Sequence, residues 1–145
     1  MEEITFNQIK SAFLYILSNM GLDEIDEEEA EELLAQRFYS EFENRWVGLC
    51  DDSPAVSINQ HQQILNDADE ICKSICRSLH HELEACIYND YILIATYLIA
   101  NVDDRYVAGM LQSYIKEEIP ILSLKSTDKS LQVIFNEFQL TKNLK

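Results

Sequence analysis

Apolar side chains recur along the chain at the three- and four-residue spacing of amphipathic helices. In the first such segment they are Phe6, Ile9, Phe13, Ile16, Leu17 and Met20. Thr5 and Gln8 stand at its start in a capping-box pattern, in which each side chain accepts a hydrogen bond from the other residue's backbone N–H. Gly21 follows, where a left-handed residue commonly ends a helix. The pattern predicts a first helix over about residues 6–20.

The second segment steps by four along one side, through Ala30, Leu34, Phe38, Phe42 and Trp46. Asp26 and Glu29 repeat the spacing of a cap and its partner three residues on. We therefore predict one helix over about 27–46, anchored to the core by Phe38, Phe42 and Trp46. Its basic side chains Arg37 and Arg45 lie four residues on either side of Glu41, and this spacing predicts surface ion pairs.

A third helix is predicted to open at Ser57 and Gln60 and to run to Tyr88. Its inner face would carry Ile64, Leu65, Ala68, Ile71, Ile75, Leu79 and Leu83. Asn89 and Asp90 indicate a break, after which Asp90 could cap a short central helix over "YILIATYLIA", residues 91–100. That segment is apolar on all sides, which is typical of a helix at the centre of a bundle.

Asp103 is the expected cap of a fifth helix, which would continue to about Ile119 and end at Pro120. Thr127 is the expected cap of a sixth helix, with Leu131, Ile134, Phe135 and Phe138 inside. The β-branched run within residues 131–138 leaves a strand open as the alternative there.

The fold class that follows is all-α, a single-domain bundle of five to six helices over residues 1–145. The chain has only three glycines and two prolines, too few turn formers for an all-β sandwich. We find no internal repeat, linker or low-complexity segment in it.

Three cysteines and two histidines crowd the segment "ICKSICRSLHHELEAC", residues 71–86. On one helix Cys72, Cys76 and Cys86 would share the arc of the leucines, as buried cysteines do. His80 would lie at the rim of that arc and His81 in solvent. Residues 72 and 80 would be about 12 Å apart, too far to share one zinc ion. We therefore predict packing cysteines, with no metal and no cofactor.

The net charge is −15 and falls mainly on the first half of the chain. Residues 1–72 hold 17 acidic against 3 basic residues, whereas residues 73–145 hold 9 against 8. Such a balance argues against direct binding of nucleic acid. The first residues lack the positive charge of a secretory signal, and the longest apolar run is half of a membrane span. We expect a cytoplasmic protein that does not bind membranes and keeps its thiols reduced.

Eight of the ten residues from Asp23 to Glu32 are acidic. Acids in the first helical turn complement the helix dipole, but this explains only part of the run. Glu29, Glu32 and Glu43 fall opposite the aromatic stripe, where no basic residue is within helical reach. We predict a partner-binding patch made of Asp23, Glu24, Asp26, Glu28, Glu29, Glu32, Glu43, Asp51 and Asp52. The alternative is a face that only meets water.

A short, acidic, all-helical chain without a catalytic motif resembles the immunity proteins of bacterial toxin systems. Those of contact-dependent growth inhibition are the most similar in kind. The resemblance lies in overall character, and it implies a one-to-one complex with a cognate basic toxin, such as a nuclease, whose active site is blocked. We expect a monomer when the chain is alone, and no enzymatic activity.

Two other classes of function stay open from the sequence. A small acidic adaptor or secretion chaperone would have a similar composition but would commonly be a dimer. An enzyme would have to use His80, Cys76 or Cys86. A mimic of DNA is a variant of the inhibitor and would need acids spaced like phosphates over several elements.

Overall fold

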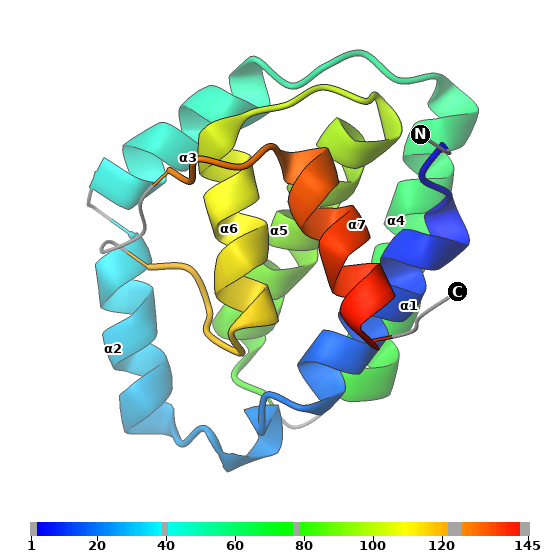
Figure 1. Ribbon diagram of the computed structural model, residues 1–145. Coiled ribbons are helices and arrows are strands. Elements are labelled where there is room, and N and C mark those ends of the chain that lie inside the picture. The colour runs from blue at the N-terminus through cyan, green and yellow to red at the C-terminus, as the bar shows by residue number, and fades with distance from the viewer. Residues whose placement is uncertain (1–2, 39–40, 77–78, 122–125, 143–145) are drawn as a thin grey trace.

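Seven α-helices and one 3₁₀ turn form the computed structural model, which describes residues 3–38, 41–76, 79–121 and 126–142 (Figure 1). The elements are α1 (Phe6–Ser18), η1 (Leu22–Glu24), α2 (Glu27–Arg37), α3 (Glu41–Asp51), α4 (Ile58–Ile75), α5 (His81–Ile99), α6 (Arg105–Ile115) and α7 (Leu131–Lys142). These ranges contain no strand. The all-α prediction is confirmed, but five to six helices was too low. The predicted helices over 27–46 and 57–88 are each divided, and the second part of the latter continues through residues 91–99 as one helix.

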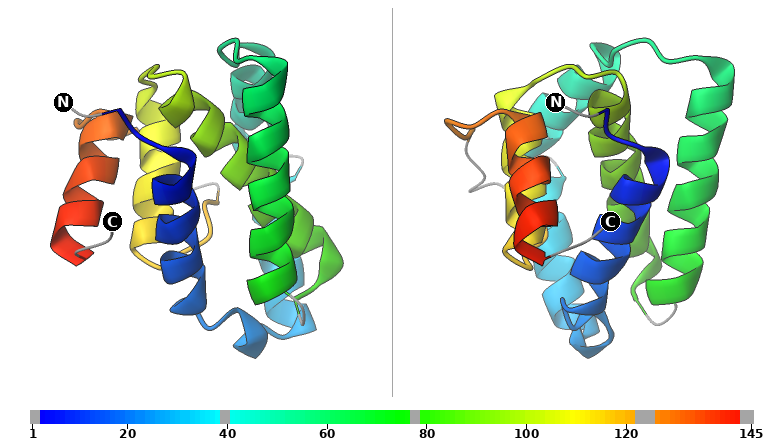
Figure 2. Two further views of the ribbon diagram at one scale, coloured as in Figure 1. Left: turned by 90° about the vertical axis from the view of Figure 1, so that its right-hand side faces the viewer. Right: turned by 45° about the vertical axis from the view of Figure 1, so that its right-hand side comes forward.

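Helix α5 is the centre of the core and packs against α1, α2, α4 and α6. The segment predicted to be a central helix lies in its second half, where almost every side chain is buried. Figure 2 shows α4 and α7 at opposite sides of the molecule, with α1 and α5 between them. The buried hydrophobic side chains form one cluster to which every α-helix contributes.

The predicted helix over 27–46 is interrupted after Arg37. Phe38 caps α2 with an extended backbone, at φ −90° and ψ 147°, and α3 begins at Glu41. Of the predicted aromatic stripe, Phe42 is 2% exposed and Trp46 is half-buried, but Phe38 is 37% exposed. Its assignment to the core was therefore wrong. The surface ladder was also wrong for Arg37, whose guanidinium turns into the core instead.

The predicted helix from Ser57 to Tyr88 is likewise two helices. α4 ends with Cys76 as its C-cap, and α5 starts after His80, whose Nδ1 accepts a hydrogen bond from the Glu82 backbone N–H. The periodicity continues across the division because both helices bury an apolar face against each other. Residues 77–78 lie outside the described residues.

The predicted break at Asn89 and Asp90 does not exist. Both residues lie inside α5, where the Asn89 amide donates to the Ala85 carbonyl and the Asp90 carboxylate is fully buried. The burial of Cys72, Cys76 and Cys86 is confirmed, although the three thiols come from two helices. His81 is exposed, as predicted, and His80 is half-buried.

Three predicted N-caps are confirmed. Thr5 with Gln8 and Ser57 with Gln60 form complete capping boxes, and the Asp26 side chain accepts from the Glu29 N–H. Gly21 is left-handed, at φ +66°, which a side chain would oppose. It lies two residues beyond the actual C-cap of α1, Asn19.

The last two helices are capped by residues other than the predicted ones. Asp104, not Asp103, accepts from the backbone at the start of α6, which ends at Ile115 and not Ile119. The Ser130 hydroxyl, not that of Thr127, accepts from the Val133 N–H. α7 is a helix, so the strand alternative for residues 131–138 is excluded. Its predicted inner side chains are all buried.

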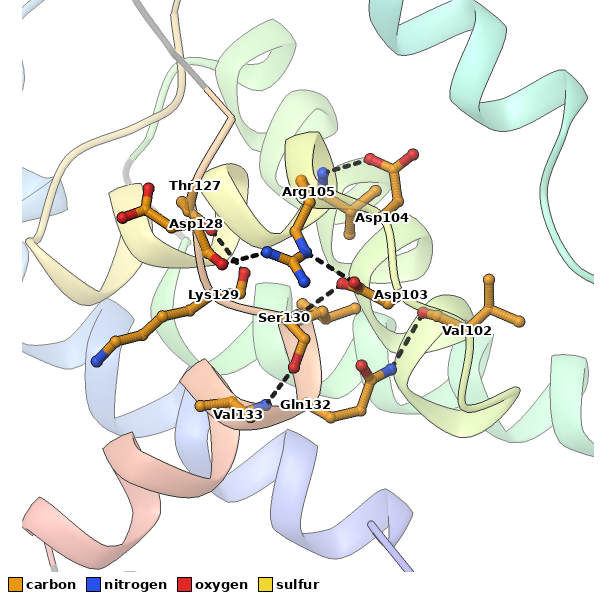
Figure 3. A network of polar contacts seen from close by, with 12 residues as sticks. Val102, Asp103, Asp104, Arg105, Thr127, Asp128, Lys129, Ser130, Gln132 and Val133 are labelled. Carbon is orange, nitrogen blue, oxygen red and sulfur yellow. Dashed lines mark hydrogen bonds and ion pairs between the residues drawn. The ribbon is translucent and has the colours of Figure 1, made fainter.

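Asp103 joins the start of α7 to the start of α6 (Figure 3). Its carboxylate accepts hydrogen bonds from the Leu131 N–H at 3.0 Å and from Arg105 Nε at 2.8 Å. The same guanidinium donates to the Asp128 carbonyl, and the Gln132 amide donates to the Val102 carbonyl. Partial burial opposes the charged form of Asp103, but these donors hold its pKa below the ordinary value. The contacts fix α7 against α6.

None of the helices described is long and apolar enough to cross a membrane.

Candidate functional site

The predicted acidic residues of the first half lie on η1 and α2. Asp23 and Glu24 are in η1, Asp26 caps α2, and Glu28, Glu29 and Glu32 are on α2 itself. All six are exposed. Three acids in the first turn stabilise the helix through its dipole, and the apolar side of α2 holds Ala30 and Leu34 in the core. The fold therefore presents these carboxylates to solvent on a fixed helix.

A hollow of about 400 Å³ lies between this acidic segment and the chain that follows α6. Glu24 and Glu29 line it from one side, and Glu117 and Glu118 line it from the other. Its remaining wall is apolar and consists of Met20, Ile25, Leu33, Ile119 and Ile121, with the backbone of Gly21. We call this feature the acidic hollow. Four glutamates together with apolar side chains suit a lysine or arginine side chain, since its stem is apolar and its head is a cation.

Asp51 and Asp52 are not brought to this hollow. They lie at the C-terminal end of α3, and Figures 1 and 2 place that end and η1 at opposite ends of the molecule. Both residues are exposed. The nine predicted residues therefore do not form one continuous patch around a single hollow.

Glu43 lines a different pocket, of about 370 Å³, between α2, α3 and the first half of α5. Its wall is mainly carbon, from the rings of Phe38, Phe42 and Trp46 and from Ala85 and Cys86. Glu43, Glu82 and Asn89 are the polar residues that complete the lining with Arg37. We call this feature the aromatic pocket. Glu43 is half-buried there, unlike the other predicted acids.

A buried ionic network supports the back of the aromatic pocket. Arg37 Nη2 donates to Asp90 Oδ1 at 2.7 Å, and Arg37 Nη1 donates to Asp90 Oδ2 at 2.9 Å. Trp46 Nε1 donates to Oδ1 at 3.0 Å, and the Tyr114 hydroxyl donates to Oδ2 at 2.6 Å. Arg37 Nη1 also donates to the Pro120 carbonyl at 3.0 Å. One carboxylate thus joins α2, α3, α5 and α6.

The network keeps Arg37 charged although it is only 4% exposed. Burial alone would lower the pKa of Arg37, but the charge and hydrogen bonds of Asp90 raise it above the ordinary value. Burial raises the pKa of Tyr114, and the neighbouring Asp90 carboxylate raises it further. The Tyr114 hydroxyl is therefore a fixed hydrogen-bond donor at neutral pH. The Arg37 guanidinium also stands 4.6 Å from the centre of the Phe42 ring, within cation–π range.

Glu117, Glu118 and the pairing of Arg37 with Asp90 are candidate functional features that the sequence did not predict. The two glutamates follow α6 and approach α2 only in three dimensions, so no local pattern indicates them. Asp90 carried a usable signal, because a lone acid beside a long apolar run is often buried and paired. It was interpreted as a cap.

The described part of the chain contains no group of three or more His, Cys, Asp or Glu side chains arranged to hold a metal ion. The buried thiols Cys72 and Cys76 interact with each other, and their pKa values move in opposite directions. The hydrogen bond between them raises the pKa of Cys72 and lowers that of Cys76. Burial raises the pKa of Cys86. These thiols lie in the core and not at the acidic hollow.

The comparison with known families identifies the chain. The family described as immunity protein PIM1 matches residues 8–121, from α1 to the segment that follows α6. No curated protein matches significantly. No solved structure does so either. The family match covers most of the sequence, including the acidic hollow and the aromatic pocket, and the protein is therefore a member of the immunity protein PIM1 family.

Proposed function

We propose that this chain is the inhibitor of a basic cognate toxin, and that the exposed carboxylates of η1 and α2, with the acidic hollow beside them, form its main contact. Membership of an immunity protein family implies a cognate toxin partner but does not specify its kind. The observation that supports a basic partner is the acidic hollow, which Glu24, Glu29, Glu117 and Glu118 line together with apolar side chains.

A nuclease is the toxin class that best suits such a surface. Nucleases line their clefts with lysine and arginine to bind phosphate, and a rigid acidic helix competes for the same positions. Complementary charge speeds association to as much as ~10⁸–10⁹ M⁻¹s⁻¹ at low salt, which helps an inhibitor to act before damage occurs. Barnase and its acidic inhibitor barstar are an established example of this physics. We propose a one-to-one complex, formed in the cytoplasm by a monomeric inhibitor, that covers the active site of the toxin.

The test uses the cognate toxin domain, to be sought among the neighbouring genes, with its active site inactivated for purification. Association and dissociation rates are measured at low and high salt for the wild type and for the double variant Glu24→Gln/Glu29→Gln. Exposed ion pairs contribute about 0.2–1 kcal/mol each, so the loss of two should weaken binding roughly 2- to 30-fold. Most of the change should be in the association rate, and the salt dependence should fall.

The matched control is Asp51→Asn/Asp52→Asn, which removes the same charge at the far end of α3. If both variants lose equal affinity, only net charge matters and the acidic hollow is not the contact. The wild type should also protect plasmid DNA or cellular RNA from the active toxin. The mass of the complex should equal one toxin plus one 16.8 kDa chain. A wild type that fails to bind this domain would refute the proposed function.

A further inference from the structure

The aromatic pocket is separate from the acidic hollow and uses different residues. The pocket is lined by the end of α2, the first half of α3 and the first half of α5. The hollow is lined by residues 20–25, by α2 and by the segment after α6. The volume of the pocket, about 370 Å³, is at the lower end of the range for pockets that enclose small ligands. This size suits one or two protein side chains.

The lining specifies what the pocket would bind. Phe38 is 37% exposed, which is unusual for a phenylalanine. Together with the half-buried Trp46 it exposes aromatic ring surface to a side chain of a binding partner. Aromatic rings add about 0.5–1.5 kcal/mol per pair beyond the area that they bury. The lining also includes Glu82, and Arg37 pairs with Asp90. Glu82 is exposed, and its carboxylate favours a cation beside the bound side chain.

The pocket is also held in shape before any partner arrives. Trp46 is fixed through its hydrogen bond to Asp90, and Arg37 is fixed by two bonds to the same carboxylate and one to Pro120. Rigid, partly apolar pockets with a polar rim are where single side chains contribute most to protein–protein affinity.

We propose that the aromatic pocket is a second contact site for the toxin and takes one aromatic side chain flanked by a lysine or arginine. The aromatic side chain packs on Phe38 and Trp46, and the cation meets Glu82. This inference rests on the proposed function and deepens it, because it adds a short-range anchor to the long-range attraction of the acidic hollow.

The first experiment needs no toxin. Trp46 is the only tryptophan in the chain, so protein labelled with 5-fluorotryptophan gives one ¹⁹F signal from the pocket wall. The signal is followed during titration with three blocked dipeptides, acetyl-Arg-Phe-amide, acetyl-Arg-Ala-amide and acetyl-Glu-Phe-amide. We expect a saturable shift with Arg-Phe in the millimolar range and at least about fivefold weaker binding of the other two.

Two results of this titration would overturn the proposal. One is an equal response to all three dipeptides, or none. The other is a shift on dilution of the labelled protein alone, because this would show that a second copy of the chain occupies the pocket.

The second experiment places a tryptophan in the pocket through Ala85→Trp. Ala85 is an exposed residue of α5, so the fold should tolerate the change. The Kd for the inactivated toxin domain should rise at least about 30-fold, because filling the pocket removes an anchor. The rise should come from faster dissociation, and the salt dependence of binding should stay unchanged. The Glu24→Gln/Glu29→Gln variant should instead associate more slowly and depend less on salt. The control Ala55→Trp adds the same side chain to the exposed connection between α3 and α4 and should bind as the wild type does.

The two proposals fail separately in this design. If the wild type binds the toxin and Ala85→Trp binds equally well, the pocket inference is wrong and the inhibitor function stands. If the wild type does not bind, the inhibitor function is wrong, and the dipeptide titration still decides whether the pocket has the proposed preference.

Discussion

Asp90→Asn tests the network that joins α2, α3, α5 and α6. Asparagine has nearly the same shape, so the variant changes hydrogen bonding and charge without creating a cavity. In the wild type, Asp90 Oδ1 accepts hydrogen bonds from Arg37 and Trp46, and Oδ2 accepts hydrogen bonds from Arg37 and Tyr114. Whichever way the new amide points, its NH₂ group faces two donors and loses both hydrogen bonds.

The expected loss in the free energy of unfolding follows from these contacts. Hydrogen bonds to a charged group contribute about 1.5–3 kcal/mol each, and two are lost while Arg37 is left buried without a counter-charge. Removing one partner of a buried ion pair costs about 3–5 kcal/mol in measured cases, which agrees with this count. We expect a loss of about 3–5 kcal/mol, a large part of the ~5–15 kcal/mol that stabilises an ordinary domain.

The measurement is urea unfolding followed by circular dichroism, with Asp69→Asn as the control at an exposed position on α4. A loss below about 1 kcal/mol for Asp90→Asn would refute the reasoning. The double variant Arg37→Met/Asp90→Asn adds a second check. Since it removes the unpaired cation, its loss should be smaller than the sum of the two single losses by about 1–3 kcal/mol. Additive losses would show that the two side chains do not act as a pair.

Three further predictions test the core. Phe42→Ala should cost about 3–5 kcal/mol in thermal or urea unfolding, and Phe38→Ala clearly less, since only the first ring is enclosed; equal losses would contradict the division of the second helix. Burial raises the pKa of Asp67, so stability is lost as pH rises from its unfolded pKa through its raised folded pKa. Asp67→Asn should therefore be more stable than the wild type at neutral pH, and this advantage should shrink in acid unfolding series. An alkylating reagent should modify only Cys50 in the native chain and all four thiols after denaturation, as counted by mass spectrometry; labelling of a second thiol under native conditions would count against a closed core.

The sequence predicted the helical class and several helix starts because those signals are local. A capping box such as Thr5 with Gln8 needs only residues three apart, and the apolar period of α1 is set by its own residues. The ends of the helices were harder to predict from the sequence. The pairing of Arg37 with Asp90, 53 residues away in sequence, turns the guanidinium at the end of α2 into the core, and no local pattern indicates it.

The candidate site was predictable in part for the same reason. The acidic run on η1 and α2 is visible in the sequence, and its exposure follows from the apolar side that α2 buries. Glu117 and Glu118 face this run only because the segment after α6 passes beside it. The aromatic pocket was hidden by the assumption of one long helix, which placed Phe38 in the core and Glu43 on a common acidic face.

The hydrogen bond from Arg37 to the Pro120 carbonyl has a consequence for recognition. Pro120 follows Glu117 and Glu118 of the acidic hollow, and the same guanidinium lines the aromatic pocket. One buried side chain therefore fixes both surfaces relative to each other in the free protein. A partner that engages both meets a preorganised template, so little conformational entropy is lost on binding and the second contact forms at high effective concentration.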